Sequence, residues 1–182
     1  MTRERIYKSE ADVKKYVKKV LDQYRWRWWM PAMNGFGQTG VSDFNALRAG
    51  VFLAVETKFG DNELTTNQEK FLNDVLSEGG FGFVVYETTV ETFEKWNELF
   101  DVATLHTSKG SAIPNEVGAG LLECARILTE PLALAEQRRA GRKATRRAKT
   151  VKRVRSGVTV DDSDHGLYQG EPLHPSEEDA DA

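Results

Sequence analysis

The sequence of 182 residues is poor in metal-binding and cross-linking side chains, with one cysteine, Cys124, and three scattered histidines. These are too few soft ligands for a zinc knuckle and too few thiols for a disulfide framework. The sequence also lacks an apolar run near the roughly 20 residues of a membrane span, and its N-terminal residues are charged where a signal peptide needs an apolar core. We therefore expect a cytoplasmic, reduced protein with no membrane partner.

The chain can bury one core of ordinary size, since 40% of its residues are hydrophobic, but its charge is unevenly distributed. Residues 1–135 carry a net charge of −4, residues 136–155 of +9 and residues 156–182 of −8. Neither charged segment has large apolar residues at a helical period, so neither can bury enough surface to offset the ordering of the chain. We expect a core at 1–103, a helical extension at 104–135, and then a basic tail followed by an acidic, disordered tail.

A first helix is predicted over residues 10–24, because its apolar side chains follow the i, i+3, i+4, i+7 rule while four lysines take other directions. Ser9 with Asp12 is typical of a capping box. Glu10 projects within roughly 20° of Val17, at the N-terminal end of the apolar stripe. A carboxylate there either caps the helix through its dipole or serves a site, and both interpretations stay open.

The segment after this helix is rich in tryptophan and glycine. Trp26, Trp28 and Trp29 indicate a strand edge and a packed corner, where their rings serve either the core or base stacking. Three glycines within residues 35–40 match the pattern G-x-G-x-x-G. They precede a strand and open no helix, which excludes a dinucleotide site.

The stretch Val41–Lys58 is the most informative part of the sequence, because it predicts two strands joined by a glycine turn. Asp43 lies on the first strand, and Glu56 lies two residues before Lys58 on the second, so these last two side chains share a face. The Thr57 side chain points the other way, which leaves its carbonyl between them. The carboxylates and the carbonyl are hard oxygens suited to Mg²⁺ or Mn²⁺, and the ammonium can orient a water or neutralise charge on a phosphate.

A charged residue inside an apolar strand needs a partner, because an unpaired ion there is strongly destabilising. An acid followed by E-x-K arises by chance about once in a chain of this length, so the placement of the pattern carries the argument. The pattern precedes a predicted helix that begins at Thr65 or Thr66 and has an apolar stripe containing Leu72 and Val75. Gln68 lies on that stripe and either closes a capping box with Thr65 or belongs to a site.

A strand at Phe81–Tyr86 and a helix at Val90–Phe100 complete an order of helix, strand hairpin, helix and strand. With these elements, residues 40–85 resemble the PD-(D/E)XK nuclease superfamily, and most of all the small standalone VRR-NUC nucleases of phages and bacteria. In that family a G-x-P-D turn supplies the metal-binding aspartate. The turn is matched here by Gly40–Asp43, with Ser42 in place of the proline.

The resemblance extends to the other site residues and implies a fold. Glu56 and Lys58 match the E-x-K strand of the family, Gln68 matches the glutamine that opens the next helix, and Glu10 matches the first-helix acid. The implied fold is α/β: a restriction-endonuclease-like core of order αβββαβ, with a mixed central sheet flanked by helices, plus a C-terminal helix and a disordered charged tail. The implied activity is Mg²⁺- or Mn²⁺-dependent hydrolysis of phosphodiester bonds that leaves 5′-phosphate ends.

We therefore hypothesise a metal-dependent DNA nuclease, a structure-selective endonuclease in phage or bacterial DNA processing, recombination or repair. It would act in the host cytoplasm if phage-encoded, and a homodimer is one arrangement that the sequence allows. The metal would be held by Asp43, Glu56 and the Thr57 carbonyl, with Glu10 binding directly or through water. The catalytic set would be Asp43, Glu56, Lys58 and Gln68, in which Lys58 positions the attacking water.

The basic tail predicts DNA as the partner, because each of its ten cations could neutralise one phosphate. The alternative is a solvated or localisation-type charge run. A second function class is a non-catalytic DNA-binding or assembly protein on a nuclease-like scaffold, against which the intact acidic and E-x-K residues argue. The acidic tail is expected to fold back on the basic one and weaken its DNA binding. The predicted nucleic-acid-binding residues are Arg138, Arg139, Arg142, Lys143, Arg146, Arg147, Lys149, Lys152, Arg153 and Arg155.

Overall fold

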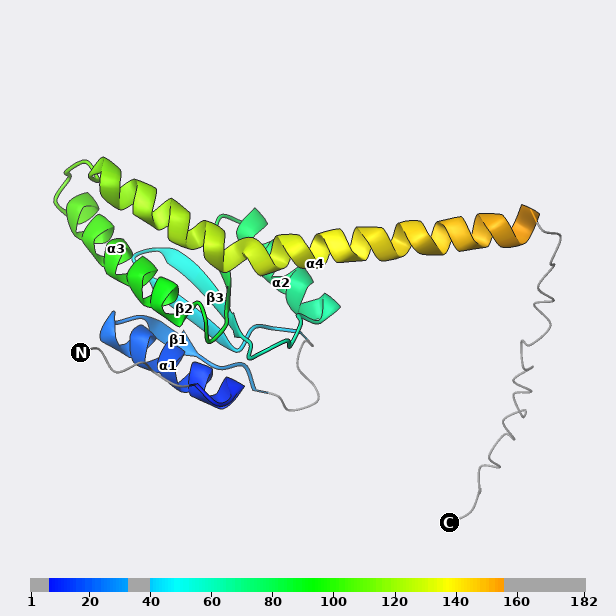
Figure 1. The fold of residues 1–182 in the computed structure, drawn as a ribbon. Helices are drawn as coiled ribbons and strands as arrows, with labels where there is room; N and C mark the ends of the chain where they lie inside the picture. Colours follow the sequence, from blue (N-terminus) through cyan, green and yellow to red (C-terminus); the bar gives the residue numbers. More distant parts are fainter. Residues whose placement is uncertain (1–6, 33–39, 156–182) are drawn as a thin grey trace, which may run out of the picture. The chain divides into compact units, whose positions relative to one another are not determined.

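Four strands and four helices make up the part of the chain that the computed structural model describes, residues 7–32 and 40–155 (Figure 1). The chain divides into two compact units, residues 1–141 and 142–182. The first six elements follow the predicted order αβββαβ. The elements are α1 (Glu10–Gln23), β1 (Arg27–Trp29), β2 (Phe44–Arg48), β3 (Val51–Thr57), α2 (Thr66–Ser77), β4 (Phe81–Val85), α3 (Val90–Ser108) and α4 (Asn115–Arg155).

The strands form one sheet of order β1-β2-β3-β4, in which β1 to β3 are antiparallel neighbours and β4 runs parallel to β3. This confirms the expected α/β class with a mixed sheet flanked by helices. The β2–β3 hairpin turns at Ala49 and Gly50, whose φ angles are 50° and 79°. Two successive residues with positive φ are typical of a type I′ turn, which matches the twist of the paired strands. The turn fixes the register in which Phe44 pairs with Val55.

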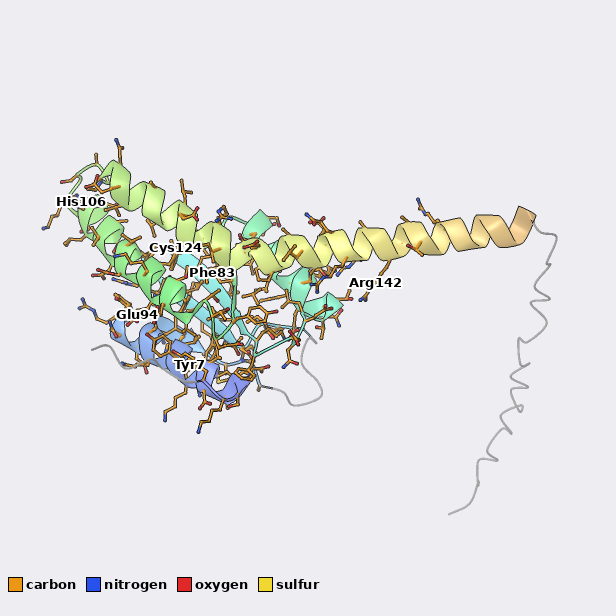
Figure 2. The ribbon with its side chains drawn as sticks, in the orientation of Figure 1. Tyr7, Phe83, Glu94, His106, Cys124 and Arg142 are labelled. Atoms are coloured by element: carbon orange, nitrogen blue, oxygen red, sulfur yellow. The ribbon has the colours of Figure 1, made fainter. Side chains whose placement is uncertain are left out.

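The two faces of the sheet bury different clusters, because successive side chains of a strand point to opposite sides. Val55 and Phe83 face a core built with α1 and α3, and Phe83 lies among the side chains packed between sheet and helices (Figure 2). Ala54 and Val84 face a smaller cluster that includes Leu72 of α2. By the same alternation Glu56 lies on the α2 face of β3 and Thr57 on the α1 face. Polar side chains at the end of this strand therefore face the helices on both sides of the sheet.

The tryptophans form a strand edge and a packed corner, as predicted. Trp26 is 4% exposed and stacks on Phe100, with ring centroids 5.2 Å apart. Its indole N–H donates a hydrogen bond to Asn97 Oδ1 at 2.7 Å, which satisfies the buried donor. Trp28 is partly buried against the same core, whereas Trp29, also on the edge strand β1, is 43% exposed.

The basic segment is helical where a tail was expected. α4 continues through residues 136–155 to Arg155, and α3 extends past the predicted Phe100 to Ser108. The tail was predicted from the lack of buried apolar surface alone. Alanine, arginine and lysine have high intrinsic helix propensity, however, and need little burial once a helix is nucleated. Leu128 and Leu132 of α4 are buried, so tertiary packing stabilises the turns that precede the basic segment. The acidic segment 156–182 and the glycine pattern before Gly40 lie outside the described residues.

Within residues 7–32 and 40–155, no helix combines the length and the apolar character that crossing a bilayer requires.

Candidate active site

The predicted site residues gather at the carboxyl end of β3, where β2 begins and the N-terminal turns of α1 and α2 approach the sheet. Asp43 stands one residue before β2, and Lys58 one residue after β3. Glu56 and Lys58 are 2% and 7% exposed, although both carry ionisable side chains. Groups of this kind are buried only with partners, and the partners of each define the site.

Three of the predicted residues form a hydrogen-bonded cluster on the α2 side. Lys58 Nζ lies 2.9 Å from Glu56 Oε1 and 3.1 Å from Gln68 Oε1. The Gln68 side-chain amide donates in turn to Glu56 Oε1. The expectation that these three side chains meet is therefore confirmed.

Gln68 closes the capping box that its position in the sequence allowed, and it also contacts the other candidate site residues. Its side-chain oxygen accepts a hydrogen bond from the Thr65 N–H at 2.9 Å, while its own N–H donates to the Thr65 hydroxyl at 3.3 Å. This is a complete capping box at the start of α2. Because the same oxygen also accepts from Lys58, the helix cap holds the glutamine against the site.

Asp43 has a second set of partners, on the α1 side. Its Oδ2 accepts hydrogen bonds from the Thr57 N–H at 3.0 Å and from the Thr57 hydroxyl at 2.5 Å. The Thr57 side chain points to the face opposite Glu56, as predicted, but its contact with Asp43 on that face was not expected from the sequence. Strand alternation does give its direction, but Asp43 lies before the first residue of β2 and turns its carboxylate to the same face.

A backbone hydrogen bond joins the Asp43 contacts to the cluster on the α2 side. The Asp43 N–H donates to Glu56 Oε2 at 3.2 Å, so the carboxylates of these residues are linked through a peptide group. Burial, together with the negative charge of Asp43, raises the pKa of Glu56 to about 7, and the hydrogen bond and charge of Lys58 offset only part of this rise. The Lys58 ammonium therefore stabilises the ionised Glu56 carboxylate less than burial and the Asp43 charge destabilise it.

Among the described residues, Glu10 is joined to Asp43 through Lys14, one of the four lysines predicted to point away from the apolar stripe of this helix. Lys14 Nζ lies 2.9 Å from Glu10 Oε1 and 2.8 Å from Asp43 Oδ1. Burial lowers the pKa of Lys14, but its hydrogen bonds to Asp43 and Glu10 outweigh this and raise the pKa overall. The i, i+4 spacing of Glu10 and Lys14 was the signal in the sequence that could have revealed the pair.

The oxygen atoms of the site are chemically suited to bind a hard divalent cation, although each carboxylate is already bonded to other residues of the protein. Asp43, Glu56 and Glu10 supply carboxylate oxygens, which Mg²⁺ and Mn²⁺ prefer. The Glu10 and Asp43 oxygens already share one cationic neighbour, Lys14, while the pKa of Glu56 is raised chiefly by its burial and then by the charge of Asp43. Among the described residues, no three His, Cys, Asp or Glu side chains form a group that could hold a metal as they stand.

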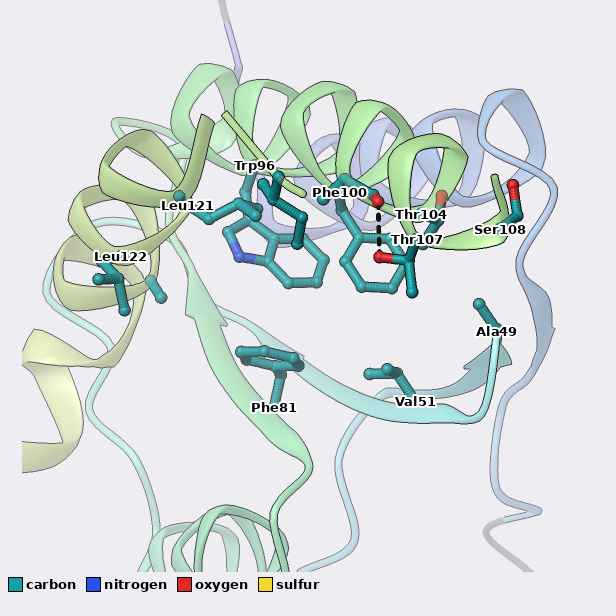
Figure 3. A pocket seen from close by; sticks show the side chains of 14 residues that line it. Ala49, Val51, Phe81, Trp96, Phe100, Thr104, Thr107, Ser108, Leu121 and Leu122 are labelled. Carbon is teal, nitrogen blue, oxygen red and sulfur yellow. Dashed lines mark hydrogen bonds between the residues drawn. The ribbon is translucent and has the colours of Figure 1, made fainter. Parts of the chain in front are cut away.

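A cavity of about 720 Å³ lies at the opposite end of the β2–β3 hairpin, under α3 and α4 (Figure 3). Val51, Phe81, Trp96 and Leu121 are among the apolar side chains that line it. The described residues that line this cavity include no acidic, basic or histidine side chain and none of the predicted site residues.

The predicted nucleic-acid-binding residues differ in what they contact. Arg138 pairs with Glu63, and Arg139 lies 2.5 Å from the buried carboxylate of Glu69, so both arginines are engaged by the folded unit that ends at Gly141. Three others, Arg142, Lys143 and Arg147, are exposed on α4. The side chains of the remaining five lie outside the described part of the chain: Arg146, Lys149, Lys152, Arg153 and Arg155.

Comparison with known families and with curated proteins finds no family model and no curated sequence that matches this chain.

Proposed function

We propose that the protein is a metal-dependent DNA nuclease that hydrolyses phosphodiester bonds, as a structure-selective endonuclease of the PD-(D/E)XK, VRR-NUC-like type. The observation that carries the proposal is the buried ammonium of Lys58, held by Glu56 and Gln68 beside Asp43. A buried ion pair contributes little net stability compared with apolar residues of the same volume, so a functional reason accounts for it better than a structural one. The sheet order and mixed topology are those the proposal requires.

Each residue has a distinct task in this mechanism. Asp43, Glu56 and the Thr57 carbonyl would hold a divalent cation, with Glu10 as an outer ligand. When bound, such a cation polarises the phosphate and neutralises the charge that develops on its oxygens. Lys58 donates hydrogen bonds to the attacking water and orients it toward phosphorus. Glu56 and Gln68 fix the direction of the lysine ammonium, so little reorganisation accompanies the reaction.

DNA is the substrate class that the charge of α4 favours. Arg142, Lys143 and Arg147 are exposed cations on a helix, and cations of this kind supply sequence-independent affinity for phosphates. A structure-selective enzyme needs such affinity, because it recognises shape rather than base edges. The same cations would also serve the alternative function, so they support DNA binding without deciding between cleavage and assembly.

One observation favours the alternative of a non-catalytic DNA-binding or assembly protein. All four carboxylate oxygens of Asp43 and Glu56 already have donors from the protein itself, among them Lys14, Thr57 and Lys58. A site satisfied in this way can be purely structural. The two functions differ in one measurable result, which is cleavage of DNA in the presence of a divalent cation.

The deciding experiment offers linear, nicked, flap and four-way DNA to the purified protein in Mg²⁺ or Mn²⁺, with EDTA as the blank. We expect cleavage of at least one substrate, and a loss of roughly 100-fold or more in Lys58→Ala and Asp43→Asn. Lys70→Ala is the matched control, because Lys70 is an exposed lysine of α2 outside the site. Folding of each variant is checked by its thermal midpoint. Cleavage by Lys58→Ala at the parent rate would overturn the proposal, and binding without cleavage by the parent would favour the assembly function.

A further inference from the structure

We propose that Lys14 is a built-in counter-cation of the candidate site, which competes with a divalent metal ion for Glu10 and Asp43. The inference rests on the proposed function for the identity of the metal site, and adds a residue that controls occupancy of that site. Its basis is the position of one ammonium between two carboxylates that come from different elements.

The geometry is that of a cation bridge. Lys14 Nζ lies 2.9 Å from Glu10 Oε1 within α1 and 2.8 Å from Oδ1 of Asp43, the residue just before β2. The side chain of Asp43 is 17% exposed, and those of Lys14 and Glu10 are 29% and 33% exposed, so the bridge is only partly screened by water. The other oxygen of Asp43 is held by Thr57, which directs Oδ1 toward the lysine.

The bridge is specific to this lysine among the four on α1. Lys15 and Lys19 are exposed, and Lys18 Nζ lies 5.9 Å from the ring centroid of Trp28. Only Lys14 stands one helical turn after Glu10, on the side of α1 that meets Asp43. Its contacts therefore follow from its position rather than from a general excess of positive charge on the helix.

Competition follows from the repulsion between like charges. A divalent ion on Asp43 Oδ1 would lie close to the lysine ammonium, and two cations at that range repel strongly in a partly buried site. Binding of the ion therefore requires the Lys14 side chain to leave both carboxylates. Breaking these two contacts offsets part of the free energy of metal binding. Removal of the lysine charge should therefore increase the affinity for the ion.

The test measures binding of Mg²⁺ and Mn²⁺ alone by titration calorimetry, in the full-length protein and without DNA. We expect Lys14→Met to bind the ions roughly tenfold more tightly than the parent. Lys14→Arg, which keeps the charge, should bind them as the parent does. Lys19→Met is the matched control, since it removes an exposed lysine of the same helix and should leave the affinity unchanged. Equal or weaker affinity in Lys14→Met, or no measurable binding by either protein, would overturn the inference.

A second readout keeps the test decisive if the methionine variant folds poorly. Without metal, Lys14→Met leaves two carboxylates facing each other with no cation between them, so its thermal midpoint should fall below that of the parent. Saturating Mg²⁺ should then raise the midpoint more in the variant than in the parent, because only the variant gains its missing counter-charge. The same rise in both proteins would contradict competition.

These measurements separate the inference from the nuclease proposal. If the parent protein cleaves no DNA but the Lys14→Met variant binds metal more tightly than the parent, the competition is supported and the nuclease proposal is contradicted. If the protein cleaves DNA but has the same metal affinity with and without Lys14, the nuclease proposal stands and the competition is contradicted.

Discussion

The side-chain oxygen of Gln68 accepts hydrogen bonds both from Lys58 Nζ, at 3.1 Å, and from the backbone N–H of Thr65, at 2.9 Å. One atom therefore closes the capping box of α2 and fixes the ammonium of the candidate site. The stability of the helix terminus and the orientation of the lysine are coupled through this glutamine, although each can be disturbed separately.

Replacement of Thr65 and of Gln68 by alanine should separate the two roles. Thr65→Ala removes only the hydroxyl of the cap, so it should lower the free energy of unfolding by about 1 kcal/mol and leave cleavage within about twofold of the parent. Gln68→Ala should lower stability by a similar amount and also lower cleavage by roughly tenfold or more, because Lys58 loses a partner. Urea denaturation and initial cleavage rates measure the two effects. Equal losses of activity in both variants would mean that Gln68 acts only through the helix.

The turn before Asp43 should be more sensitive to substitution than the hairpin turn. Gly40 has a φ of +84°, and a Cβ there would lie 2.2 Å from the Asn67 Cβ at the start of α2. Gly50 has nearly the same φ, +79°, with nothing within 4 Å of an added Cβ. Gly50→Ala should therefore cost only the strain of positive φ, about 1 kcal/mol.

Gly40→Ala should cost that strain and the displacement of α2 from the turn, about 3 kcal/mol or more in unfolding free energy. It should also lower activity in the fraction that stays folded, since the turn positions Asp43. Thermal midpoints of the two variants in one buffer give the comparison. Equal midpoints would show that the contact between the turn and α2 does not constrain the fold.

Local periodicity was enough to predict most of the fold. The amphipathic stripes of α1 and α2, the glycine in the β2–β3 turn and the burial of Glu56 all follow from residues close together in sequence. For the same reason the convergence of Glu56, Lys58 and Gln68 could be predicted, because strand alternation and a helix cap place them.

The features that the sequence did not predict depend on contacts between distant segments or on intrinsic helix propensity, which the prediction did not consider. Lys14 bonds Asp43 across 29 positions of sequence, and nothing in the helical pattern of α1 marks that lysine as the one facing β2. The Thr57 hydroxyl meets Asp43 because the aspartate lies just outside the strand, where alternation no longer applies. The helix through residues 136–155 was missed because intrinsic propensity was given no weight against burial.

The exposed cations of α4 should determine the salt dependence of DNA binding. Replacement of Arg142, Lys143 and Arg147 by glutamine removes three phosphate partners, so the slope of log affinity against log salt concentration should become shallower by about 3. Arg139→Gln is an informative comparison, because Arg139 is already paired with the buried Glu69. Its replacement should lower the stability of the fold more than it changes the salt slope. Fluorescence anisotropy with one duplex at several salt concentrations gives the slopes. An unchanged slope in the triple variant would place the DNA contacts elsewhere.

Glu56 should make the stability of the metal-free protein depend on pH. Its pKa is raised to about 7 in the folded protein, first by burial and then by the charge of Asp43, from a value of 4.5 in an exposed chain. The folded state thus holds the proton more tightly than the unfolded state, so this contribution to stability is full below about pH 4.5 and is lost as the pH rises through about 7. The loss is on the order of 3 kcal/mol.

Glu56→Gln isolates this effect, because the amide cannot ionise while every other titrating group stays the same. In EDTA, the free energy of unfolding of the parent should fall relative to that of the variant between pH 5 and pH 8, as measured by urea denaturation. Addition of Mg²⁺ should reduce the fall in the parent, because a cation bound by the site stabilises the ionised carboxylate. Parallel pH profiles for parent and variant in EDTA would show that Glu56 ionises normally, and that Lys58 supplies enough positive charge to hold both carboxylates without a metal ion.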